Sequence, residues 1–427
     1  MRVALNYGRG RLTVELPAGC EVTLIGKPPM PLLPDAAAAL EAALRGPVAA
    51  APLAELARGA GSACILICDI TRPVPNGAIL PPLIRTLLAA GLPAHRIHVL
   101  VATGLHRPNE GAELAELVGD PWVLRTVAVA NHDARDEAAH VDVGITSRGT
   151  RVRLDRRFVE SDLRIATGLV EPHFMAGWSG GRKVIAPGVA HRETITTFHS
   201  ARFMEHPRAA NCVLEGNPLH AEQLEIVAMI GGALAVNAVI DEERRISFLN
   251  FGEVQASHLA AVDFVRAYAE VPVPRRFHTV LTSAAGYPLD KTYYQTVKGM
   301  VGPMDILAPG GNLVIASECS EGMGSADYVA AQRRLVALGP RGFLEAIEAK
   351  RHADIDEWQT EMQLKPMRLG AIHLYAGGLP ADAHGLTGVN VVPSVEEAVA
   401  ASVAASGDPH VAVIPEGPYV VPVYRPE

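Results

Sequence analysis

Residues 171–199 hold the densest group of side chains that could carry out chemistry. Within this stretch, residues 177–183 read Gly-Trp-Ser-Gly-Gly-Arg-Lys, and His173 and His199 flank them. Because glycine has no Cβ, backbone amides in such a turn can approach an anion closely. Histidine titrates near neutral pH and ligates metals, while Lys183 offers a point charge or a nucleophilic amine. The stretch therefore predicts an anion cradle beside groups that move protons, bind a metal or form a covalent bond.

This glycine-rich segment departs from the standard nucleotide-binding motifs. A P-loop needs Gly, four residues and then Gly-Lys-Ser/Thr, but Ala176 stands at the first glycine position and Arg182 follows Gly181. No Gly-x-Gly-x-x-Gly occurs in the chain, which disfavours a conventional nicotinamide dehydrogenase. Taken alone, the segment also fits a plain connection between packed elements, with its histidines satisfied in the core. The assignment therefore depends on residues elsewhere.

Strand–loop–helix repeats are expected to position these residues. Continuous apolar runs predict strands covered on both faces, as in a parallel sheet. In the first part of the chain, these strands are expected at 63–68, 97–102, 127–130 and 163–167. Helices are expected at 35–45, 80–90, 109–118, 192–205, 218–230 and 253–270.

A second α/β pattern follows residues 271–276, Val-Pro-Val-Pro-Arg-Arg, which predict an extended linker. Its strands are expected at 278–283, 312–317, 371–376, 389–392 and 410–414, and its helices at 291–301, 325–336, 340–350 and 394–405. We therefore predict an α/β fold of two domains, each with a mostly parallel sheet flanked by helices. The N-terminal domain is expected at 1–270, beginning with a β-ribbon in 1–26, and the C-terminal domain at 275–409. The tail, about 410–427, is expected to pack back on the first domain.

Polar clusters follow the predicted strands, where open α/β sheets bind ligands. Three lie in the first domain: Asp69-x-Thr71-Arg72-Pro73, Thr103-Gly104-Leu105-His106-Arg107-Pro108 and Glu171-Pro172-His173. In the second domain, Gln295 and Lys298 are three residues apart and share a helix face. Any one of these groups fits a solvated surface charge or amide. Together they predict an active site in the cleft between the domains.

These clusters resemble the motifs of a known family, the nickel-dependent lactate racemases and their 2-hydroxy-acid racemase relatives. The resemblance spans both domains and nearly the whole chain. Besides the three first-domain clusters, it rests on Gly177-x-Ser179-Gly180-Gly181-x-Lys183, Pro187-Gly188, His199 and Tyr294-Gln295-x-x-Lys298.

The resemblance implies a tethered cofactor, the nickel-pincer nucleotide (pyridinium-3,5-bisthiocarboxylic acid mononucleotide), linked through Lys183. It implies that His199 ligates the metal and that His106 and His173 are paired acid–base catalysts. The remaining implied cofactor-binding residues are Asp69, Thr103, Gly104, Ser179, Gly180, Gly181 and Trp358. The implied substrate-binding residues are Arg72, Tyr294, Gln295 and Lys298. Asp69 would orient a neighbour or contact the cofactor, and Trp358 fits a pocket wall and a core aromatic equally well. Trp178 is larger than its family counterpart and is expected to reshape the pocket.

The residue types suit inversion of a 2-hydroxy acid. Its α-hydrogen is poorly acidic beside a carboxylate, so removal as a hydride, with a base taking the hydroxyl proton, avoids two charges on one small molecule. Since no side chain accepts a hydride, a cofactor must do so. Return of the hydride to the other face then calls for two proton carriers, one toward each enantiomer. Arg72 and Lys298 would hold the carboxylate.

Three functions remain open from the sequence. The first is racemisation of lactate or a short aliphatic relative. The second is the same chemistry on malate, an aromatic 2-hydroxy acid or a sugar acid, and a diacid would need a further cation, for which Arg107 and Arg182 are candidates. The third is a non-catalytic nucleotide- or metal-binding protein, disfavoured because a pure binder has no use for both His106 and His173. Separate cofactor maturation proteins are expected partners, and the oligomeric state is not indicated.

Composition sets outer bounds on these functions. The net charge of −8 and the absence of a basic stripe argue against nucleic-acid binding. No run of about 18 apolar residues predicts a membrane span, and the N-terminus lacks a signal-peptide pattern. Five cysteines without a framework spacing favour the cytoplasm.

Overall fold

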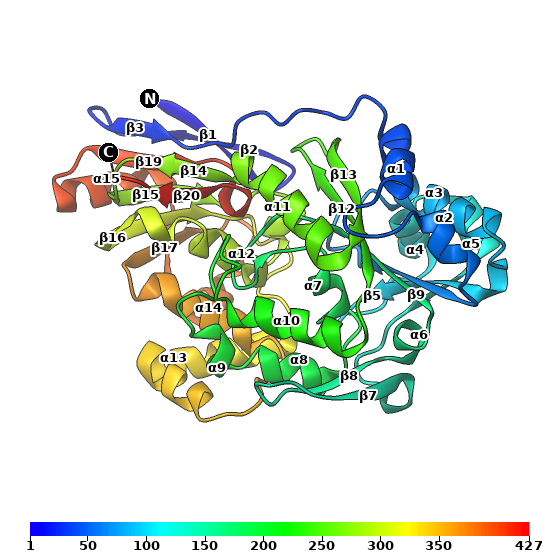
Figure 1. Cartoon of the computed structure of the whole chain (residues 1–427). Coiled ribbons are helices and arrows are strands. Elements are labelled where there is room, and N and C mark those ends of the chain that lie inside the picture. The colour runs from blue at the N-terminus through cyan, green and yellow to red at the C-terminus, as the bar shows by residue number, and fades with distance from the viewer. Residues whose placement is uncertain (427) are drawn as a thin grey trace.

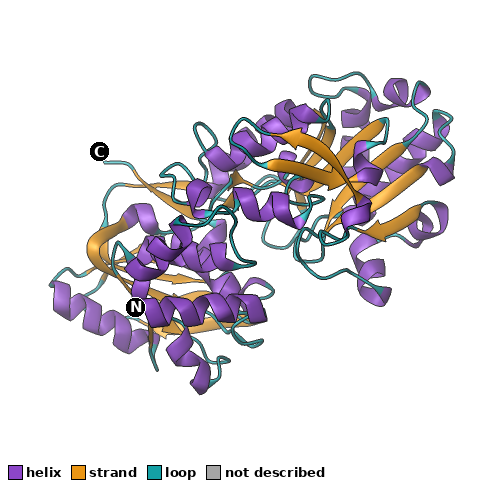
Figure 2. Ribbon diagram, turned by 90° about the horizontal axis from the view of Figure 1, so that it is seen from below, coloured by secondary structure: helices purple, strands orange, loops and turns teal. Residues whose placement is uncertain are grey.

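The computed structural model describes residues 1–426 and consists of two α/β lobes (Figures 1 and 2). The first sheet has the order β13-β12-β9-β4-β5-β6, in which only β13 runs antiparallel to its neighbour. Its strands are β4 (Ala63–Cys68), β5 (Ile97–Ala102), β6 (Ala128–Asn131), β9 (Leu163–Leu169), β12 (Leu234–Ile240) and β13 (Ile246–Glu253).

Helices cover both faces of this sheet, as the unbroken apolar strands predicted. Ile65 and Ile67 of β4 pack in a core with the helices of one face, and Cys64 and Leu66 face the opposite core. The first face is covered by α1 (Ala36–Arg45), α2 (Leu53–Arg58) and α3 (Asn76–Ala89), with α4 (Gly111–Val118) and α5 (Pro121–Thr126) beside α3. The opposite core includes side chains of α7 (Arg182–Ile185), α8 (Arg192–Phe198), α9 (Ala201–Met204) and α10 (Pro218–Met229), while α11 (Val254–Ala269) packs on β12 and β13.

Two small antiparallel pairs extend this lobe. The pair β10 (Pro172–His173) and β11 (Gly177–Trp178) directly follows β9, and the pair β7 (His140–Ile145) and β8 (Arg151–Asp155) precedes α6 (Arg156–Val159).

The second sheet is parallel throughout, with the order β18-β17-β16-β15-β19-β3. Its strands are β3 (Glu21–Leu24), β15 (Phe277–Ser283), β16 (Leu307–Ala316), β17 (Ala371–Tyr375), β18 (Asn390–Val391) and β19 (His410–Ile414). One face packs with α12 (Tyr293–Val301) and α14 (Glu357–Met367), while α15 (Val395–Ser406) and the hairpin of β1 (Arg2–Tyr7) and β2 (Gly10–Glu15) contribute to the core on the other. Helix α13 (Ala326–Glu348) breaks at Gly339, which has a φ of 71° and precedes Pro340. The two predicted helices are therefore present.

The chain ends are more interleaved than the predicted division at residue 270. β3 pairs with β19, so residues 21–24 lie in the second sheet although they precede the first. The start of the predicted tail does not pack on the first domain, because β19 (His410–Ile414) lies inside the second sheet. Further along, β20 (Val421–Tyr424) pairs in parallel with β14 (Glu270–Val273). The predicted linker is therefore extended, and its first residues form a paired strand. Among the described residues, no helix has the length and apolar character needed to cross a bilayer.

The predicted helix at 192–205 is two helices. α8 ends at Phe198, and Ser200 has the extended backbone of a cap, with its hydroxyl donating to Thr197 O at 2.7 Å. A serine hydroxyl bonded to a nearby carbonyl competes with a continuing helix. The break leaves His199 between the two helices.

Candidate active site

A pocket between the two lobes collects nearly all the residues singled out from the sequence. The space in and at the mouth of the pocket is about 1100 Å³, which includes open solvent. The first lobe contributes residues that follow β4, β5 and β9, and the second contributes α12 and the start of α14. The predicted residues that line the pocket are Asp69, Arg72, Thr103, Gly104, His106, His173, Ser179, Gly180, Lys183, His199, Tyr294, Gln295, Lys298 and Trp358.

Gly181, predicted as a cofactor-binding residue, lies outside the pocket wall. Its backbone has a φ of +49°, and a Cβ there would approach His258 Cβ to 2.9 Å, behind the loop. Glycine is therefore needed at 181 for a left-handed turn and close packing. Ser179 lines the pocket, but its hydroxyl donates to Leu169 O at 2.7 Å and accepts from Glu171 N at 3.0 Å. These bonds fasten the β10–β11 hairpin to the end of β9.

His106 forms a dyad with Asp69. Its Nδ1 lies 2.5 Å from Asp69 Oδ2, while Asp69 Oδ1 accepts from the backbone and hydroxyl of Thr71. Although burial lowers the pKa of His106, the hydrogen bond and charge of Asp69 raise it above its usual value. Half of the His106 side chain is exposed because it projects into the open pocket. With Nδ1–H donating to the carboxylate, Nε2 is the nitrogen available to a ligand.

His173 has the opposite environment. It is buried, and its Nδ1 accepts from Ala176 N at 3.2 Å, so the neutral ring carries its proton on Nε2. Burial, and then the positive charges of Lys183, Arg72 and Lys298, hold its pKa well below the usual range. The two histidines therefore differ in both tautomer and proton affinity.

The donor set fits a tethered cofactor and a nitrogen-ligated metal. Burial, and then the charge of Arg72, lower the pKa of Lys183 to about 7, so a large fraction of its amine is neutral and nucleophilic at neutral pH. His199 Nδ1 donates to Ile195 O at 2.9 Å, and burial lowers its pKa to about 4, leaving a neutral ring with a free Nε2 lone pair. Backbone fixation of one ring nitrogen is the usual arrangement for a metal-binding histidine. Trp358 packs on His199 with ring centroids 5.0 Å apart, and its Nε1 donates to the Tyr294 hydroxyl at 3.3 Å.

Thr103 and Gly104 shape the loop that carries His106. The Thr103 hydroxyl donates to His132 O at 2.8 Å, and Thr103 O accepts from His106 N at 2.9 Å. Gly104 has a φ of +55° and donates its N–H to Gly188 O at 2.9 Å, which joins this loop to the segment between α7 and α8.

The two cationic candidates for substrate binding, Arg72 and Lys298, differ in whether a carboxylate pairs with them. Arg72 is paired with Glu171, which raises the pKa of the guanidinium despite the opposing effect of burial. Lys298 has no carboxylate within ion-pair distance among the described residues, and burial and the charge of Arg72 lower its pKa to about 7. Gln295 Oε1 is buried and has no hydrogen-bond partner among the described residues, so it is free for a ligand.

Three sequence expectations about the pocket are wrong. Arg107 lies on the surface, paired with Glu113, and does not line the pocket. Arg182 is buried behind the glycine-rich loop and is also outside the wall. Trp178 is fully buried, and its Nε1 donates to Cys212 O at 3.2 Å, so it packs in the core and does not line the pocket.

Sequence reasoning missed the residues at the start of α14. Asp356 and Gln359 line the pocket with Trp358. Asp356 has a φ of +62° and accepts from Ser325 Oγ at 2.5 Å, and Gln359 Nε2 donates to Tyr294 O at 2.5 Å. No local sequence pattern marks this turn, and Trp358 is the one residue near it that resembles a family motif.

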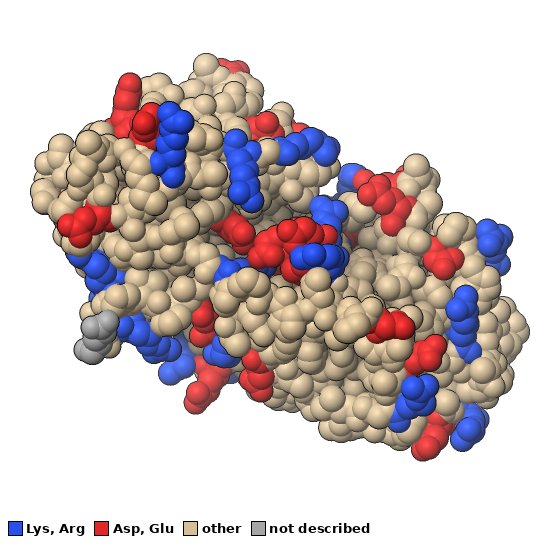
Figure 3. Space-filling model, turned by 90° about the horizontal axis from the view of Figure 1, so that it is seen from above, with Lys and Arg blue, Asp and Glu red and all other residues tan. Residues whose placement is uncertain are grey.

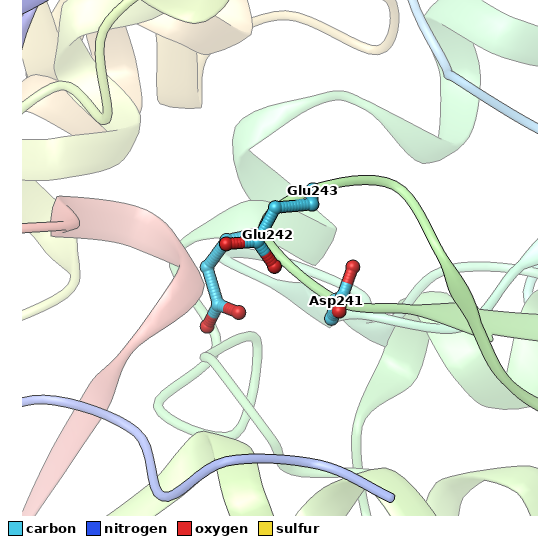
Figure 4. A group of neighbouring side chains, drawn as sticks. All are labelled: Asp241, Glu242 and Glu243. Atoms are coloured by element: carbon cyan, nitrogen blue, oxygen red, sulfur yellow. The ribbon is translucent and has the colours of Figure 1, made fainter. Parts of the chain in front are cut away.

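A separate acidic group lies in the turn between β12 and β13. Asp241, Glu242 and Glu243 bring carboxylate oxygens close enough to share a cation (Figure 4). Arg245 already pairs with Asp241 and Glu243, and Lys27 pairs with Glu242. Acidic and basic residues are interspersed across the face that Figure 3 shows. This group contains none of the pocket residues, and we assign it no metal.

Comparison with known proteins supports the resemblance seen in the sequence. The family model for the lactate racemase N-terminal domain matches residues 7–211, and that for the C-terminal domain matches residues 274–422. The chain is 33% identical to the lactate racemase of Lactiplantibacillus plantarum over 326 residues, 76% of each protein. It is 35% identical over 286 residues to that of Thermoanaerobacterium thermosaccharolyticum, covering 67% of this chain and 66% of the relative.

Solved structures agree. The lactate racemase apoprotein from Thermoanaerobacterium thermosaccharolyticum superposes with a TM-score of 0.90 at 28% identity, over 99% of this chain and 100% of that one. A protein from Thermotoga maritima, at 18% identity and a TM-score of 0.66, covers 87% of this chain and 96% of its own and shares the fold. The chain therefore belongs to the lactate racemase family and is a racemase, that is, an isomerase.

Proposed function

We propose that this racemase inverts C2 of a small 2-hydroxy monocarboxylate, lactate or a short aliphatic relative, with a nickel-pincer nucleotide tethered to Lys183. The observation that carries the proposal is that His106 and His173, from different loops of the chain, line one pocket with Lys183 and His199. Two proton carriers in one pocket suit a reaction that must run from either enantiomer.

The cofactor, when bound, would supply the hydride acceptor and donor that side chains lack. Lys183 would hold it through a thioamide, which requires the neutral amine that burial favours. His199 would ligate nickel through Nε2, and imidazole with sulfur donors is a reasonable ligand set for that metal. Trp358 would support His199 from one side, and the backbone around Thr103, Gly104 and Ser179–Gly181 would surround the nucleotide.

In the proposed reaction, His106 takes the substrate hydroxyl proton at Nε2, while Asp69 holds the tautomer and stabilises the imidazolium. His173 would serve the other enantiomer from its own Nε2, after its ring proton has moved to Nδ1 and the Ala176 N–H has been released. Attachment through Lys183 would remove the positive charge that most lowers the pKa of His173, leaving that ring readier to hold a proton. This change would make two unlike histidines more nearly equal in the loaded enzyme.

The remaining residues would bind and enclose the substrate. Lys298 would bind the carboxylate, since Glu171 already balances the charge of Arg72. Gln295 would bond the substrate oxygens through its unpartnered amide. Tyr294 and Trp358 would exclude water from the reacting carbon.

The pocket favours a monocarboxylate over malate. A second carboxylate would need a second free cation, and neither Arg107 nor Arg182 lines the wall. Aromatic 2-hydroxy acids and sugar acids remain alternatives for the same chemistry, and a non-catalytic role would leave the histidine pair without purpose. We further propose a cytoplasmic location, consistent with five free cysteines among the described residues, and loading by separate maturation proteins.

The test uses protein produced with the maturation proteins and incubates it in D₂O with each pure lactate enantiomer. Chiral chromatography then measures the proportion of the two enantiomers. Both enantiomers should converge on an equal mixture, with the C2 hydrogen retained because it moves as a hydride. Malate and mandelate should react more slowly. Deuterium at C2 would contradict the hydride route, and no racemisation by loaded protein would contradict the substrate assignment.

A further inference from the structure

Arg182 is a buried cation without a carboxylate partner in the described part of the chain. It is 1% exposed, and it makes no ion pair among the described residues. Its Nη1 lies 2.9 Å from His258 Nε2, its Nη2 donates to Ala176 O at 2.9 Å, and its Nε has no partner among the residues that the structure describes. Burial lowers the pKa of the guanidinium to about 9, which still leaves it charged at neutral pH.

The side chains around Arg182 do not balance this charge. Burial, and then the Arg182 charge, lower the pKa of His258 well below its usual value and that of His220 to about 3, so both rings are neutral. His258 Nε2 also lies 2.8 Å from Ser179 O. The guanidinium therefore contacts a neutral imidazole and the carbonyl of Ala176, an arrangement that is costly for a buried charge.

This charge lies directly behind the glycine-rich loop. Gly181 packs against His258, while Ser179 and Gly180 present the other side of the loop to the pocket. The field of Arg182 reaches across the loop, because its charge contributes to the lowered pKa of both Lys183 and His173 in the pocket. Since a low-dielectric interior screens weakly, a charge held there acts on a ligand that it does not touch.

We propose that Arg182 is a positioning residue whose uncompensated charge favours a phosphate group bound against Ser179 and Gly180. The ligand is a phosphate monoester, which would be that of the mononucleotide under the proposed function. A bound dianion would supply the opposite charge that the protein interior lacks. The loop backbone would contact the phosphate, and Arg182 would act on it through the loop.

The experiment uses the full-length protein produced without maturation proteins, so that Lys183 is unmodified, and titrates inorganic phosphate and nicotinic acid mononucleotide by calorimetry. Arg182→Met and Arg182→Gln remove the charge, Arg182→Lys keeps it, and Arg341→Met removes a charge from an arginine with a side chain 93% exposed. We expect both uncharged variants to weaken binding by about tenfold or more, a loss of about 1.4 kcal/mol. Arg182→Lys should stay within about threefold, and Arg341→Met should match the wild type.

Thermal unfolding of the same proteins separates this role from a structural one. Removing an uncompensated buried charge should leave the melting temperature of Arg182→Met equal to or above that of the wild type in phosphate-free buffer. Equal phosphate affinity in folded wild type, Arg182→Met and Arg182→Gln would overturn the proposal, as would a wild type that binds neither ligand. Either result would leave the racemisation test of the proposed function untouched.

Discussion

Nδ1 of His106 lies 2.5 Å from Oδ2 of Asp69, and this contact makes His106 unlike His173, the second proposed acid–base histidine. The carboxylate fixes the proton of the neutral ring on Nδ1 and raises its proton affinity. His173 instead accepts a backbone N–H at Nδ1 and has a lowered pKa. One pocket thus holds two histidines in complementary states before any cofactor is attached.

Asp69→Asn should lower the pKa of His106, because the carboxylate is the group that raises it. The acid limb of kcat/KM, measured with the enantiomer whose proton His106 accepts, should move to lower pH. The rate should also fall by about 10- to 100-fold, since the tautomer is no longer fixed. An unshifted acid limb would contradict the dyad, and Asp382→Asn, at an exposed position, serves as the control.

His106→Ala and His173→Ala should each abolish racemisation in both directions, because a catalyst cannot change the equilibrium. In rapid mixing with one pure enantiomer, hydride transfer should be retained better in one of the two variants. With the other enantiomer, it should be retained better in the second variant. The absorbance of the loaded cofactor reports this step, and His95→Ala, at an exposed histidine, is the matched control. If each variant lost the same fraction of hydride transfer with both enantiomers, the assignment of one histidine to each enantiomer would be wrong.

Lys298→Ala should raise KM by about 10-fold or more, since a carboxylate loses a charge-assisted contact. Cofactor loading should persist, because Lys183 and His199 lie in the other lobe. Intact mass and KM measured on one preparation separate the two effects. Equal loss of adduct and activity would contradict the assignment of Lys298 to substrate binding alone. Lys291→Ala, outside the pocket, is the control.

Lys183→Met should stabilise the protein produced without cofactor by about 1–4 kcal/mol, because it removes a buried amine. The folded pKa of about 7 is below the usual 10.5, so between these values the unfolded state binds more protons. The stability penalty is therefore complete below pH 7 and fades as the pH rises to 10.5. Urea unfolding at pH 6.5 and pH 10 should show the larger gain at the lower pH, and a gain independent of pH would refute the lowered pKa.

The strand pattern of the sequence predicted most of the fold because both sheets are mostly parallel and covered on both faces. β4 and β5 have the predicted boundaries, and β15 and β17 each differ from prediction by one residue. Strands β12 and β13, which complete the first sheet, were not predicted from the sequence. Nor was the pairing of β3 with β19, a contact between chain ends that no local pattern encodes.

The pocket was predictable because strand-end motifs meet where sheet edges meet. Contacts made with backbone atoms were not predictable from the sequence. Ser179 reads as a ligand group but bonds Leu169 O, and Arg182 reads as a pocket cation but points behind the loop. The position of Asp356 in the pocket depends on its left-handed backbone before α14, which the neighbouring residues do not predict.

The central claim is that Lys183 carries the cofactor, and intact-mass measurement tests it most directly. Protein produced with the maturation proteins should gain the mass of a nickel-bearing mononucleotide, and Lys183→Ala should not gain it. Lys365→Ala, at another partly buried lysine outside the pocket, should still be modified. A wild-type protein that stays unmodified, or an adduct that persists in Lys183→Ala, would contradict the account.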